Sequence, residues 1–464
     1  MVIIELDCET VHNGDQQFAC WGVIYYLDRR LKNDEAAVLI LQLYREFGES
    51  FTSQLFGYYA ILIQDKEKTL LIQSVLGSPV ELFFTRSESA CIISNRLRLI
   101  LKRIAAPAPA GGAVQAEFLR FGFLAGSSTL IDHVNKVPIG TCVVIDERSN
   151  HIISYPIQWY TVPEYTQEEA VAAYPTLMHS VIRESLQDVP RPAVTLSAGF
   201  DSNWILWHAA SDRSKTVDAF CVGGKLGRDE KTAARRCASV YENVSLHEGE
   251  VNSHTLEMLP DIVRRLEGTV FERGIFLQYV LAEKVHNAGC KTIMEGDGAD
   301  QVMNIGFSFF SENRPADDLW HERPDLALRY LVLPKNLKMM ESFHVDCDYA
   351  YLSPKILACL RGLKGLNGTT KAYHMNVVQE HVDSTIRSLL YNRGGTTHYA
   401  ALFENEEICR RFCQGTEMPD LAGLRRLYHD RTMESILEGF VKKLYLDTFY
   451  RVFLTDREGI FDEN

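Results

Sequence analysis

The stretch AVTLSAGFDSNWIL, residues 193–206, decides the fold class of this chain. Its first four residues are mostly apolar and predict a short buried strand, and the apolar residues after Asp201 predict a helix. Between them, Ser197, Ala198 and Gly199 have little side-chain bulk and can turn tightly. Free backbone N–H groups and the positive end of the helix dipole point outward together at such a turn. The stretch therefore predicts an anion-binding loop.

A second small-residue turn, EGDGADQ at residues 295–301, follows a predicted strand at 291–294. Ligands of a doubly wound sheet lie beyond the carboxyl ends of its strands, so the two turns can face one crevice. Asp201 and Asp300 are then candidate ligands for Mg²⁺, which takes one or two carboxylates plus phosphate oxygens. The alternative is that Asp201 and Asp297 are helix caps and the glycines are ordinary turn residues. Two such turns, each after a strand, favour nucleotide binding.

Composition sets the broad class of the protein. A chain of 464 residues favours two or more domains, and 46 % hydrophobic with 23 % charged residues is an ordinary globular composition. The net charge of −13 argues against a nucleic-acid groove. Eleven scattered cysteines without a CxxC pair indicate reduced thiols and a cytoplasmic location. We find no secretory signal and no apolar run of about 18 residues, so we expect no membrane contact.

The pattern of predicted secondary structure changes at about one third of the chain length. Residues 1 to about 155 are mostly short runs rich in aromatic and β-branched residues, which predict strands, with one helix at 35–47. A linker is expected around 155–165, and from 167 onward helices alternate with single strands. This alternation predicts a parallel sheet with helices on both faces. The expected elements are helices at 167–185, from Asp229 and at 275–287, strands at 193–196, 217–222 and 291–294, and a helical region from about 305.

These motifs carry a family resemblance. SAGFDS is similar to the SGGxDS pyrophosphate loop of the ATP-pyrophosphatase superfamily, and EGDGADQ resembles the SGEGADE segment of asparagine synthetases. DEKTAARRCASVY resembles the segment between those two, and LFGYYAILIQD and QSVLGSPVELFFT resemble the glutaminase half of a class B asparagine synthetase. The resemblance implies an antiparallel Ntn-hydrolase-like, glutaminase-type sandwich over residues 1–160. It implies a doubly wound ATP-pyrophosphatase domain with a helical C-terminal lobe over residues 167–464.

One departure from this family concerns the glutaminase nucleophile. The family's glutaminase needs a Cys directly after the initiator Met, and Val2 stands there. Cys8 and Cys20 lie in predicted strands, where we expect them to be core thiols. The resemblance therefore implies an inactive glutaminase domain that releases no ammonia. Relatives of that kind include the β-lactam synthetases and the lasso peptide macrolactam synthetases. Both activate a carboxylate as an acyl-adenylate, which an amine of the same molecule then attacks.

The resemblance also implies roles for individual residues. Asp297 stands where asparagine synthetases have Glu and β-lactam synthetases have Tyr, a position that helps deprotonate or orient the amine. Lys442, or failing that Lys443, is the cation that stabilises the tetrahedral and pyrophosphate charges, although paired lysines on an amphipathic helix usually lie in water. Ala198 replaces a loop Gly, at a cost if the backbone there needs positive φ. ATP is expected on Leu196, Ser197, Ala198, Gly199, Asp201, Ser202, Val222, Gly296 and Gly298, with Mg²⁺ on Asp201 and Asp300.

We therefore expect an ATP-dependent amide ligase that forms AMP and pyrophosphate. Macrolactam closure of a lasso peptide, a step of antibiotic biosynthesis, is the expected reaction. The alternatives are a β-lactam synthetase, an ammonia-dependent asparagine synthetase and a non-catalytic nucleotide-binding adaptor. A leader-peptide protease and a recognition protein are expected partners. The role of Glu267 stays open. Aromatic residues that could line a peptide cavity, or simply lie in the core, are Phe307, Phe309, Phe310, Trp320, Tyr391, Tyr399 and Phe403.

Overall fold

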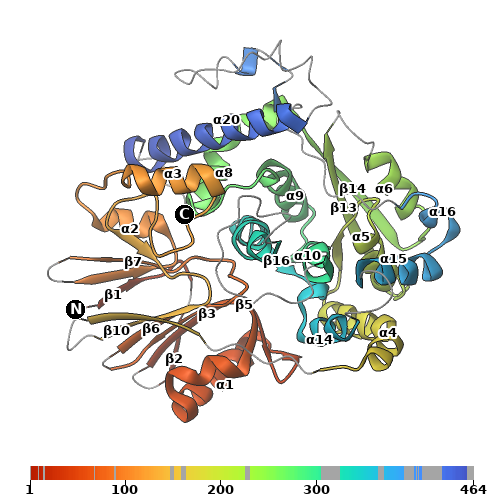
Figure 1. The fold of residues 1–464 in the computed structure, drawn as a ribbon, viewed down its shortest axis with the longest axis horizontal. Helices are drawn as coiled ribbons and strands as arrows, with labels where there is room; N and C mark the ends of the chain where they lie inside the picture. The colour runs from red at the N-terminus through yellow and green to blue at the C-terminus, as the bar shows by residue number, and fades with distance from the viewer. Residues whose placement is uncertain are drawn as a thin grey trace.

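The structure of the protein is a computed structural model with two packed regions (Figure 1). It is an α/β structure with an N-terminal region of two sheets and a C-terminal region built on a parallel sheet. The described residues are 2–8, 10–13, 16–66, 68–87, 90–146, 151–157, 164–224, 230–304, 324–363, 370–390, 402–403, 405, 407–409 and 431–456.

The N-terminal region is a two-sheet sandwich. One sheet has the order β1-β8-β7-β9, and the other has β11-β10-β6-β5-β3-β2, with β4 paired to β3. A buried apolar cluster with Leu62 and Leu71 from the second sheet and Phe84 and Ile93 from the first fills the space between them. The strands are β1 (Val2–Glu5), β2 (Val11–Asn13), β3 (Gln16–Tyr26), β4 (Arg29–Arg30), β5 (Leu55–Gln64), β6 (Lys68–Gln73), β7 (Phe83–Arg86), β8 (Cys91–Ser94), β9 (Val134–Lys136), β10 (Thr141–Asp146) and β11 (His151–Pro156).

Two expectations for this region need correction. The sequence indicated one helix, α1 (Asn33–Phe47), which is present, but α2 (Leu97–Arg103) and α3 (Gly112–Phe121) are also there. Only Phe118 of α3 is buried, so α3 lacks the wide apolar face that would have predicted it. Cys8 is not in a strand: β1 ends at Glu5, and Cys8 lies exposed in the bend that follows. Cys20 is within β3, as expected.

The C-terminal region is built on a five-stranded, fully parallel sheet. Its order is β14-β13-β12-β15-β16, so β12 lies at the centre. The strands are β12 (Ala193–Thr195), β13 (Val217–Gly224), β14 (Val244–Val251), β15 (Thr292–Met294) and β16 (Asp346–Asp348). The sequence predicted three of these strands and missed β14 and β16. Strand β14 has the largely polar sequence VSLHEGEV, which does not resemble a buried strand, and β16 has only three residues, too few to give a pattern.

Helices cover both faces of the parallel sheet, as the alternation predicted. Helices α5 (Phe200–Ala210) and α6 (Glu230–Ala238) lie on one face, and α9 (Ile275–Asn287) and α13 (Leu333–Ser342) lie on the other (Figure 1). Helix α4 (Gln167–Leu186) packs on α5 and α14 (Pro354–Gly362). The N-cap Thr166 and Glu169 form a capping box, which explains why α4 begins where the sequence indicated.

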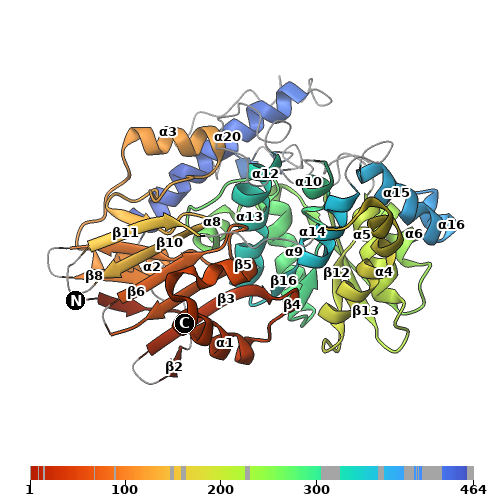
Figure 2. The ribbon, with the colours of Figure 1, turned by 60° about the horizontal axis from the view of Figure 1, so that its bottom comes forward.

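The helical C-terminal lobe is confirmed over its described residues. It includes α15 (Thr370–His381), α16 (Ser384–Arg387) and α20 (Arg431–Tyr450), and α20 lies beside α3 and α8 (Leu259–Leu266) (Figure 2). Phe403 is 4 % exposed and belongs to the core. The other six aromatic residues expected around a peptide cavity, and the expected N-cap Asp229, lie outside the described residues. None of the described helices is long and apolar enough to cross a membrane.

The two regions share a buried, partly ionic interface. Tyr58 of β5 donates to the carboxylate of Asp348 over 2.7 Å, and Arg30 of β4 forms an ion pair with the same carboxylate. Arg30 and Tyr58 outweigh the effect of burial and lower the pKa of Asp348. One continuous apolar cluster runs through both regions. The parallel sheet is therefore held against the sandwich by buried charge as well as by apolar contact.

The Arg30–Asp348 pair yields a stability prediction. Arg30→Ala leaves the Asp348 carboxylate, which is 2 % exposed, with neutral partners only. Breaking a buried pair by removing one partner costs about 3–5 kcal/mol. We expect a loss near the lower end in chemical denaturation, because Arg30 is 32 % exposed. The control is Arg29→Ala, whose pair with Glu35 is exposed, so it should cost less than about 1 kcal/mol. Equal losses would contradict the role of the buried pair.

Candidate functional site

The two small-residue turns meet at the centre of the parallel sheet. They follow neighbouring parallel strands, β12 and β15. The Gly296 N–H donates to Thr195 Oγ1 over 3.4 Å, and a Cβ on Gly296 would lie 3.3 Å from Ser202 N and 3.6 Å from Asp201 Cβ. Gly296 is therefore the residue that lets the second turn approach the first, as the crevice hypothesis required.

The first turn is held in shape by its own hydrogen bonds. Ser197 Oγ and Ser202 Oγ lie 3.0 Å apart, and the Gly199 N–H donates to Ser197 Oγ over 3.0 Å. The Asn203 side-chain amide donates over 2.8 Å to the carbonyls of both Ser197 and Gly199. Ala198 is fully buried and is not among the described residues with positive φ. Ala in place of Gly therefore causes no backbone strain through φ at this position.

Lys371 joins the two predicted metal ligands. Its Nζ lies 2.6 and 2.7 Å from the two carboxylate oxygens of Asp201 and 2.7 Å from Asp300 Oδ1. His374, one turn further along α15, places Nε2 3.0 Å from Asp201 Oδ1, and Tyr174 lies 2.8 Å from its other ring nitrogen. The structure therefore brings Asp201 and Asp300 to a single cation position, which the Lys371 ammonium fills.

The protonation states in this cluster follow from its charges. Burial alone would raise the pKa of Asp201, but His374 and Lys371 outweigh it and hold that pKa below its usual range. Burial opposes the charge on Lys371, yet Asp201 and Asp300 raise its pKa. Burial lowers the pKa of His374. The cluster therefore contains an ammonium ion and ionised Asp201 at neutral pH.

The donor set at this position suits Mg²⁺. Asp201 and Asp300 converge on one point, and their side chains are 20 % and 48 % exposed, so a phosphate can reach it from solvent. Mg²⁺ prefers one or two carboxylates completed by water and phosphate oxygens. Asp201 and Asp300 would hold the ion, and Lys371 would move or stay as a second cation.

Asp297, the candidate base, is exposed on the second turn. The Asn336 side-chain amide donates over 2.6 Å to Asp297 Oδ2 and over 2.6 Å to Glu295 Oε2. Gly298 has φ +90°, a conformation that favours glycine and lets the turn bend directly after Asp297. Asp297 thus presents a carboxylate to solvent from a constrained backbone.

The two candidate lysines of α20 differ in environment. Lys443 is exposed, whereas Lys442 is 8 % exposed. The Lys442 ammonium donates to the Arg120 carbonyl over 3.4 Å and lies 5.8 Å from the Phe271 ring centroid, and burial lowers its pKa. Within the described residues, no hydrogen bond or ion pair joins Lys442 to Asp201, Asp297 or Asp300.

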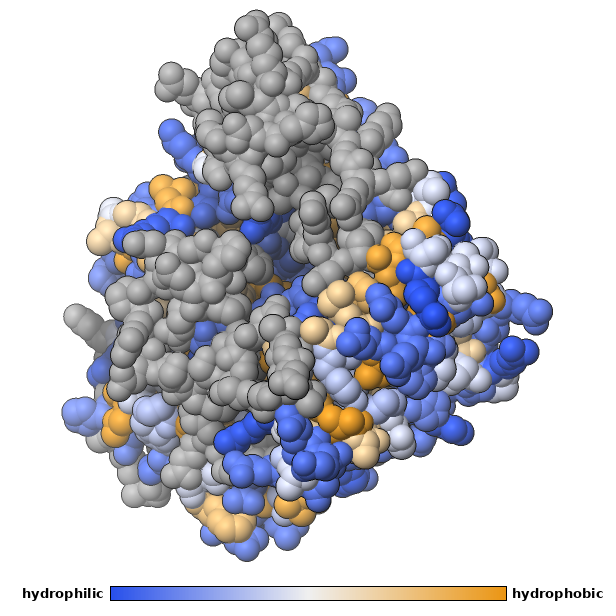
Figure 3. Space-filling model, turned by 45° about the vertical axis from the view of Figure 1, so that its right-hand side comes forward, coloured by the Kyte–Doolittle hydropathy of each residue, from blue (hydrophilic) through white to orange (hydrophobic). Residues whose placement is uncertain are grey.

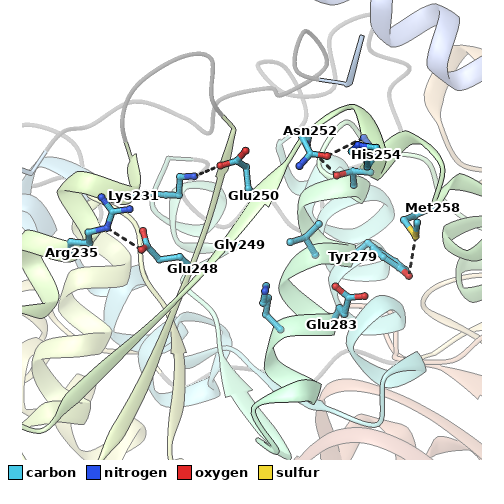
Figure 4. A pocket seen from close by; sticks show the side chains of 13 residues that line it. Lys231, Arg235, Glu248, Gly249, Glu250, Asn252, His254, Met258, Tyr279 and Glu283 are labelled. Atoms are coloured by element: carbon cyan, nitrogen blue, oxygen red, sulfur yellow. Dashed lines mark hydrogen bonds and ion pairs between the residues drawn. The ribbon is translucent and has the colours of Figure 1, made fainter. Parts of the chain in front are cut away.

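Two of the residues on which ATP is expected, Leu196 and Val222, lie at the ends of two paired strands. Leu196 and Val222 are both buried, directly beyond or within the last residues of β12 and β13. A separate pocket of about 490 Å³ lies near the edge strand β14 and contains none of the predicted site residues (Figure 4). Ion pairs of 2.6 Å between Lys231 and Glu250 and 3.0 Å between Arg235 and Glu248 line it. Over the coloured part of the face in Figure 3, hydrophilic residues dominate.

Sequence reasoning missed several residues of this site. Lys371 and His374 are spaced three residues apart, as one helix face requires, but lie far from both turns in the sequence. Asn336 comes from α13 and gave no signal. Glu295 lies in the second turn, but the sequence does not show that its side chain is buried.

A comparison with protein families places the chain. The model of the family described as "Asparagine synthase" matches residues 173–406, half of the chain. The chain belongs to the asparagine synthase family. Members of this family are ATP-dependent carbon–nitrogen ligases that form AMP and pyrophosphate. The match covers the parallel-sheet region, so the resemblance of residues 1–160 to a glutaminase stays a prediction.

The relatives found by sequence comparison have low identity to this chain, and their chains are longer. A probable asparagine synthetase of Dictyostelium discoideum is 27 % identical over 36 % of this chain and 30 % of its own. An asparagine synthetase of Asparagus officinalis is 22 % identical over 64 % and 47 %. Amidase chry2 of Gibberella zeae is 23 % identical over 57 % and 42 %. The chain thus spans less than half the length of these relatives. A solved amidotransferase of B. subtilis is 11 % identical over 77 % of this chain and 75 % of its own, with a TM-score of 0.21, too low to support an argument.

The Lys371 cluster yields a second prediction. Lys371→Met leaves two carboxylates facing each other without a cation, so we expect a loss of about 3 kcal/mol in unfolding free energy. Added Mg²⁺ should restore part of the melting temperature, since it neutralises the same carboxylates. Lys355→Met is the control, because its pair with Glu184 lies at the surface and should cost less than about 1 kcal/mol. A variant that is destabilised but insensitive to Mg²⁺ would contradict the metal assignment.

Proposed function

We propose that this protein is an ATP-dependent ligase that closes an amide within one substrate molecule. Its substrate is a lasso-type precursor peptide, in which the N-terminal amine joins an Asp or Glu side chain. The observation that carries the ligase chemistry is the meeting of the two turns, with Asp201 and Asp300 on one cation position beside Asp297. The family membership supports ATP as the activating reagent.

The raised pKa values of Cys8 and Cys20 support the proposal that the attacking amine belongs to the substrate and does not come from glutamine. Burial raises the pKa of Cys20 to about 12. Partial desolvation and the charge of Asp7 raise the pKa of the solvent-exposed Cys8 thiol to about 11, so neither is a thiolate at neutral pH. Val2 lies in β1, paired with Cys91, and offers no nucleophile. With no activated thiol among these residues, glutamine is a poor nitrogen donor for this chain.

The first half-reaction forms the acyl-adenylate. The substrate carboxylate attacks the α-phosphorus, and the bond to the β-phosphate oxygen breaks. Backbone N–H groups at the N-terminus of α5 and the Ser197 and Ser202 hydroxyls bind the leaving pyrophosphate. Mg²⁺ held by Asp201 and Asp300 would neutralise charge on the phosphates. Lys371, displaced from the two carboxylates by that ion, would supply a second positive charge near the phosphates.

The second half-reaction forms the amide. The substrate amine loses a proton to Asp297, its nitrogen bonds to the acyl carbon, and the bond to the AMP oxygen breaks. Lys442 stabilises the negative charge that develops on the acyl oxygen. Asp297 is suited to its part because it is exposed to substrate while Asn336 fixes its orientation.

Ammonia-dependent asparagine synthesis is the second candidate. Several relatives are named glutamine-hydrolyzing asparagine synthetases, which favours asparagine as the product but not free ammonia as the nitrogen source. Both candidates use the same adenylation chemistry and differ in the amine. For the peptide reaction, we propose a leader-peptide protease and a recognition protein as partners, and a short precursor gene with such a protease beside it would support that choice.

The division of labour between the half-reactions is testable. Asp201→Asn and Asp300→Asn should abolish ATP–pyrophosphate exchange, whereas Asp297→Asn should keep the exchange and lose about 10²–10⁴-fold in amide formation. The substrates are the peptides encoded beside the gene and, separately, aspartate with ammonium. Asp212→Asn, a surface carboxylate that caps its own turn, is the control and should leave both unchanged.

Each result of this experiment has a meaning. Exchange with the peptide alone supports the proposal, and exchange with aspartate and ammonium supports the second candidate. ATP binding without pyrophosphate release in any arm indicates an adaptor. Unchanged AMP formation in both Asp201→Asn and Asp300→Asn would remove the metal assignment.

The two α20 lysines can be separated in the same assay. Lys442→Met should lower the rate of amide formation by about 10²–10³-fold, as loss of one charge-stabilising donor does. Lys443→Met should change it little, because Lys443 lies in water. Equal losses, or a loss confined to Lys443→Met, would contradict the choice of Lys442. Thermal melting of both variants checks that each is folded.

A further inference from the structure

We propose that Glu295 and Asp297 act as one proton-accepting carboxyl pair held together by Asn336, in which exposed Asp297 meets the amine and buried Glu295 lies behind it. The proposal deepens the proposed function and rests on it, since deprotonation of the amine is the step that the pair serves. Glu295 is a positioning residue here, because it does not itself reach solvent or substrate.

The geometry of the pair is defined by one amide nitrogen. Asn336 Nδ2 donates to Glu295 Oε2 over 2.6 Å and to Asp297 Oδ2 over 2.6 Å. The two carboxyl groups can therefore be no further apart than two short hydrogen bonds allow. Asn336 is neutral, so it holds the groups together without cancelling the repulsion between their charges.

The other hydrogen-bond donors to Glu295 are polar and uncharged. Glu295 is 1 % exposed, Gln278 of α9 donates to its Oε1 over 2.8 Å, and the Tyr349 hydroxyl donates to its Oε2 over 3.2 Å. Burial first, and the charge of Asp297 second, raise the pKa of Glu295 to about 7. A group of this kind shares protons with its neighbour near neutral pH.

Other titratable groups face the pair from α13 and from the end of β16. Lys335 of α13 is a cation that acts on Glu295, and its Nζ already lies 2.7 Å from Glu272. Tyr349 and Cys347 have pKa values well above their usual ranges, chiefly through burial, so both are neutral at pH 7. Lys335 therefore offsets part of the repulsion, and the pair keeps a net negative charge when both its members are ionised.

This charge has a consequence for the amine. A single aspartate with a pKa near 4 is a weak base toward an ammonium ion. Two neighbouring carboxylates disfavour the doubly charged state, so the pair as a whole takes up the proton that leaves the amine more readily than an isolated carboxylate does. One proton of the ammonium ion moves to Asp297 Oδ, and the freed nitrogen lone pair forms the C–N bond. AMP then leaves with the electrons of the broken C–O bond, and the second proton passes from the nitrogen to the departing phosphate. Glu295 supplies the repulsion that drives the first of these transfers.

A purely structural role for Glu295 predicts something different. If Glu295 only oriented Asn336, the activity should tolerate Glu295→Gln, because Gln has a similar size and keeps an acceptor oxygen. The charge of Glu295, and not its shape, is what the proposal requires, so Glu295→Gln is the deciding substitution.

The titration of the pair can be measured on the protein alone. Infrared difference spectra across about pH 5 to 9 report each carboxylic acid through its C=O band. We expect a buried acid that titrates near pH 7, is lost in Glu295→Gln, and moves to lower pH in Asp297→Asn, because the neighbouring charge is gone. Glu267→Gln is the matched control: Glu267 is also buried with a pKa raised to about 7, but Asp297 is not among the groups that act on it.

Two results would contradict the proposed pair. One is that no carboxylic acid titrating near neutral pH is lost in Glu295→Gln. The other is that the pH at which the Glu295 band titrates is unchanged in Asp297→Asn. Because this measurement needs no substrate, it decides the pair even if no peptide is adenylated, a failure that would count against the proposed function alone.

With an active substrate, the pH profile of amide formation gives the second readout. In the parent protein, the rate should rise with pH through about 7 as the pair loses its shared proton. Glu295→Gln should shift this acidic limb at least one pH unit lower and reduce the plateau about tenfold or more, since the remaining base is weaker. A reduced rate with an unshifted limb would show that Glu295 acts only as a strut.

Discussion

One ammonium ion between two carboxylates organises the centre of this protein. Lys371 of α15 lies within 2.7 Å of both Asp201 and Asp300, which come from turns nearly one hundred residues apart. Like charges at such short range repel strongly unless a cation separates them. The positive charge that α15 brings therefore stabilises the meeting of the turns, and a divalent ion would serve the same electrostatic purpose.

The buried interface between the two regions shows a second use of charge. Asp348 ends β16 of the parallel sheet, yet its partners Arg30 and Tyr58 belong to the sandwich. Glu267 similarly accepts the Leu97 N–H over 2.7 Å across the same interface. Directional contacts of this kind fix the relative placement of the regions, which apolar contact alone does less well.

The second turn differs in sequence from the motif that it resembles. The turn that resembles SGEGADE carries Glu295 at the first position and Asp297 at the third. The shorter Asp297 side chain is fixed by Asn336, and the extra carboxyl of Glu295 lies directly behind it. A shorter base and an added buried acid are therefore coupled features, because the same amide serves both.

The sequence by itself determined the architecture: the periodicity of apolar residues places α4, α5 and α9, and strand–turn–helix order places both Gly/Asp turns at the carboxyl edge of a parallel sheet. Short or polar elements such as α3, β14 and β16 escaped it, because their burial comes from neighbours distant in the chain. Only the tertiary structure decided that Lys371 lies between Asp201 and Asp300, that Asn336 joins Glu295 to Asp297, and that Lys442 rather than Lys443 is buried. Long-range packing sets these contacts and the pKa values that follow, and local sequence patterns carry no record of it.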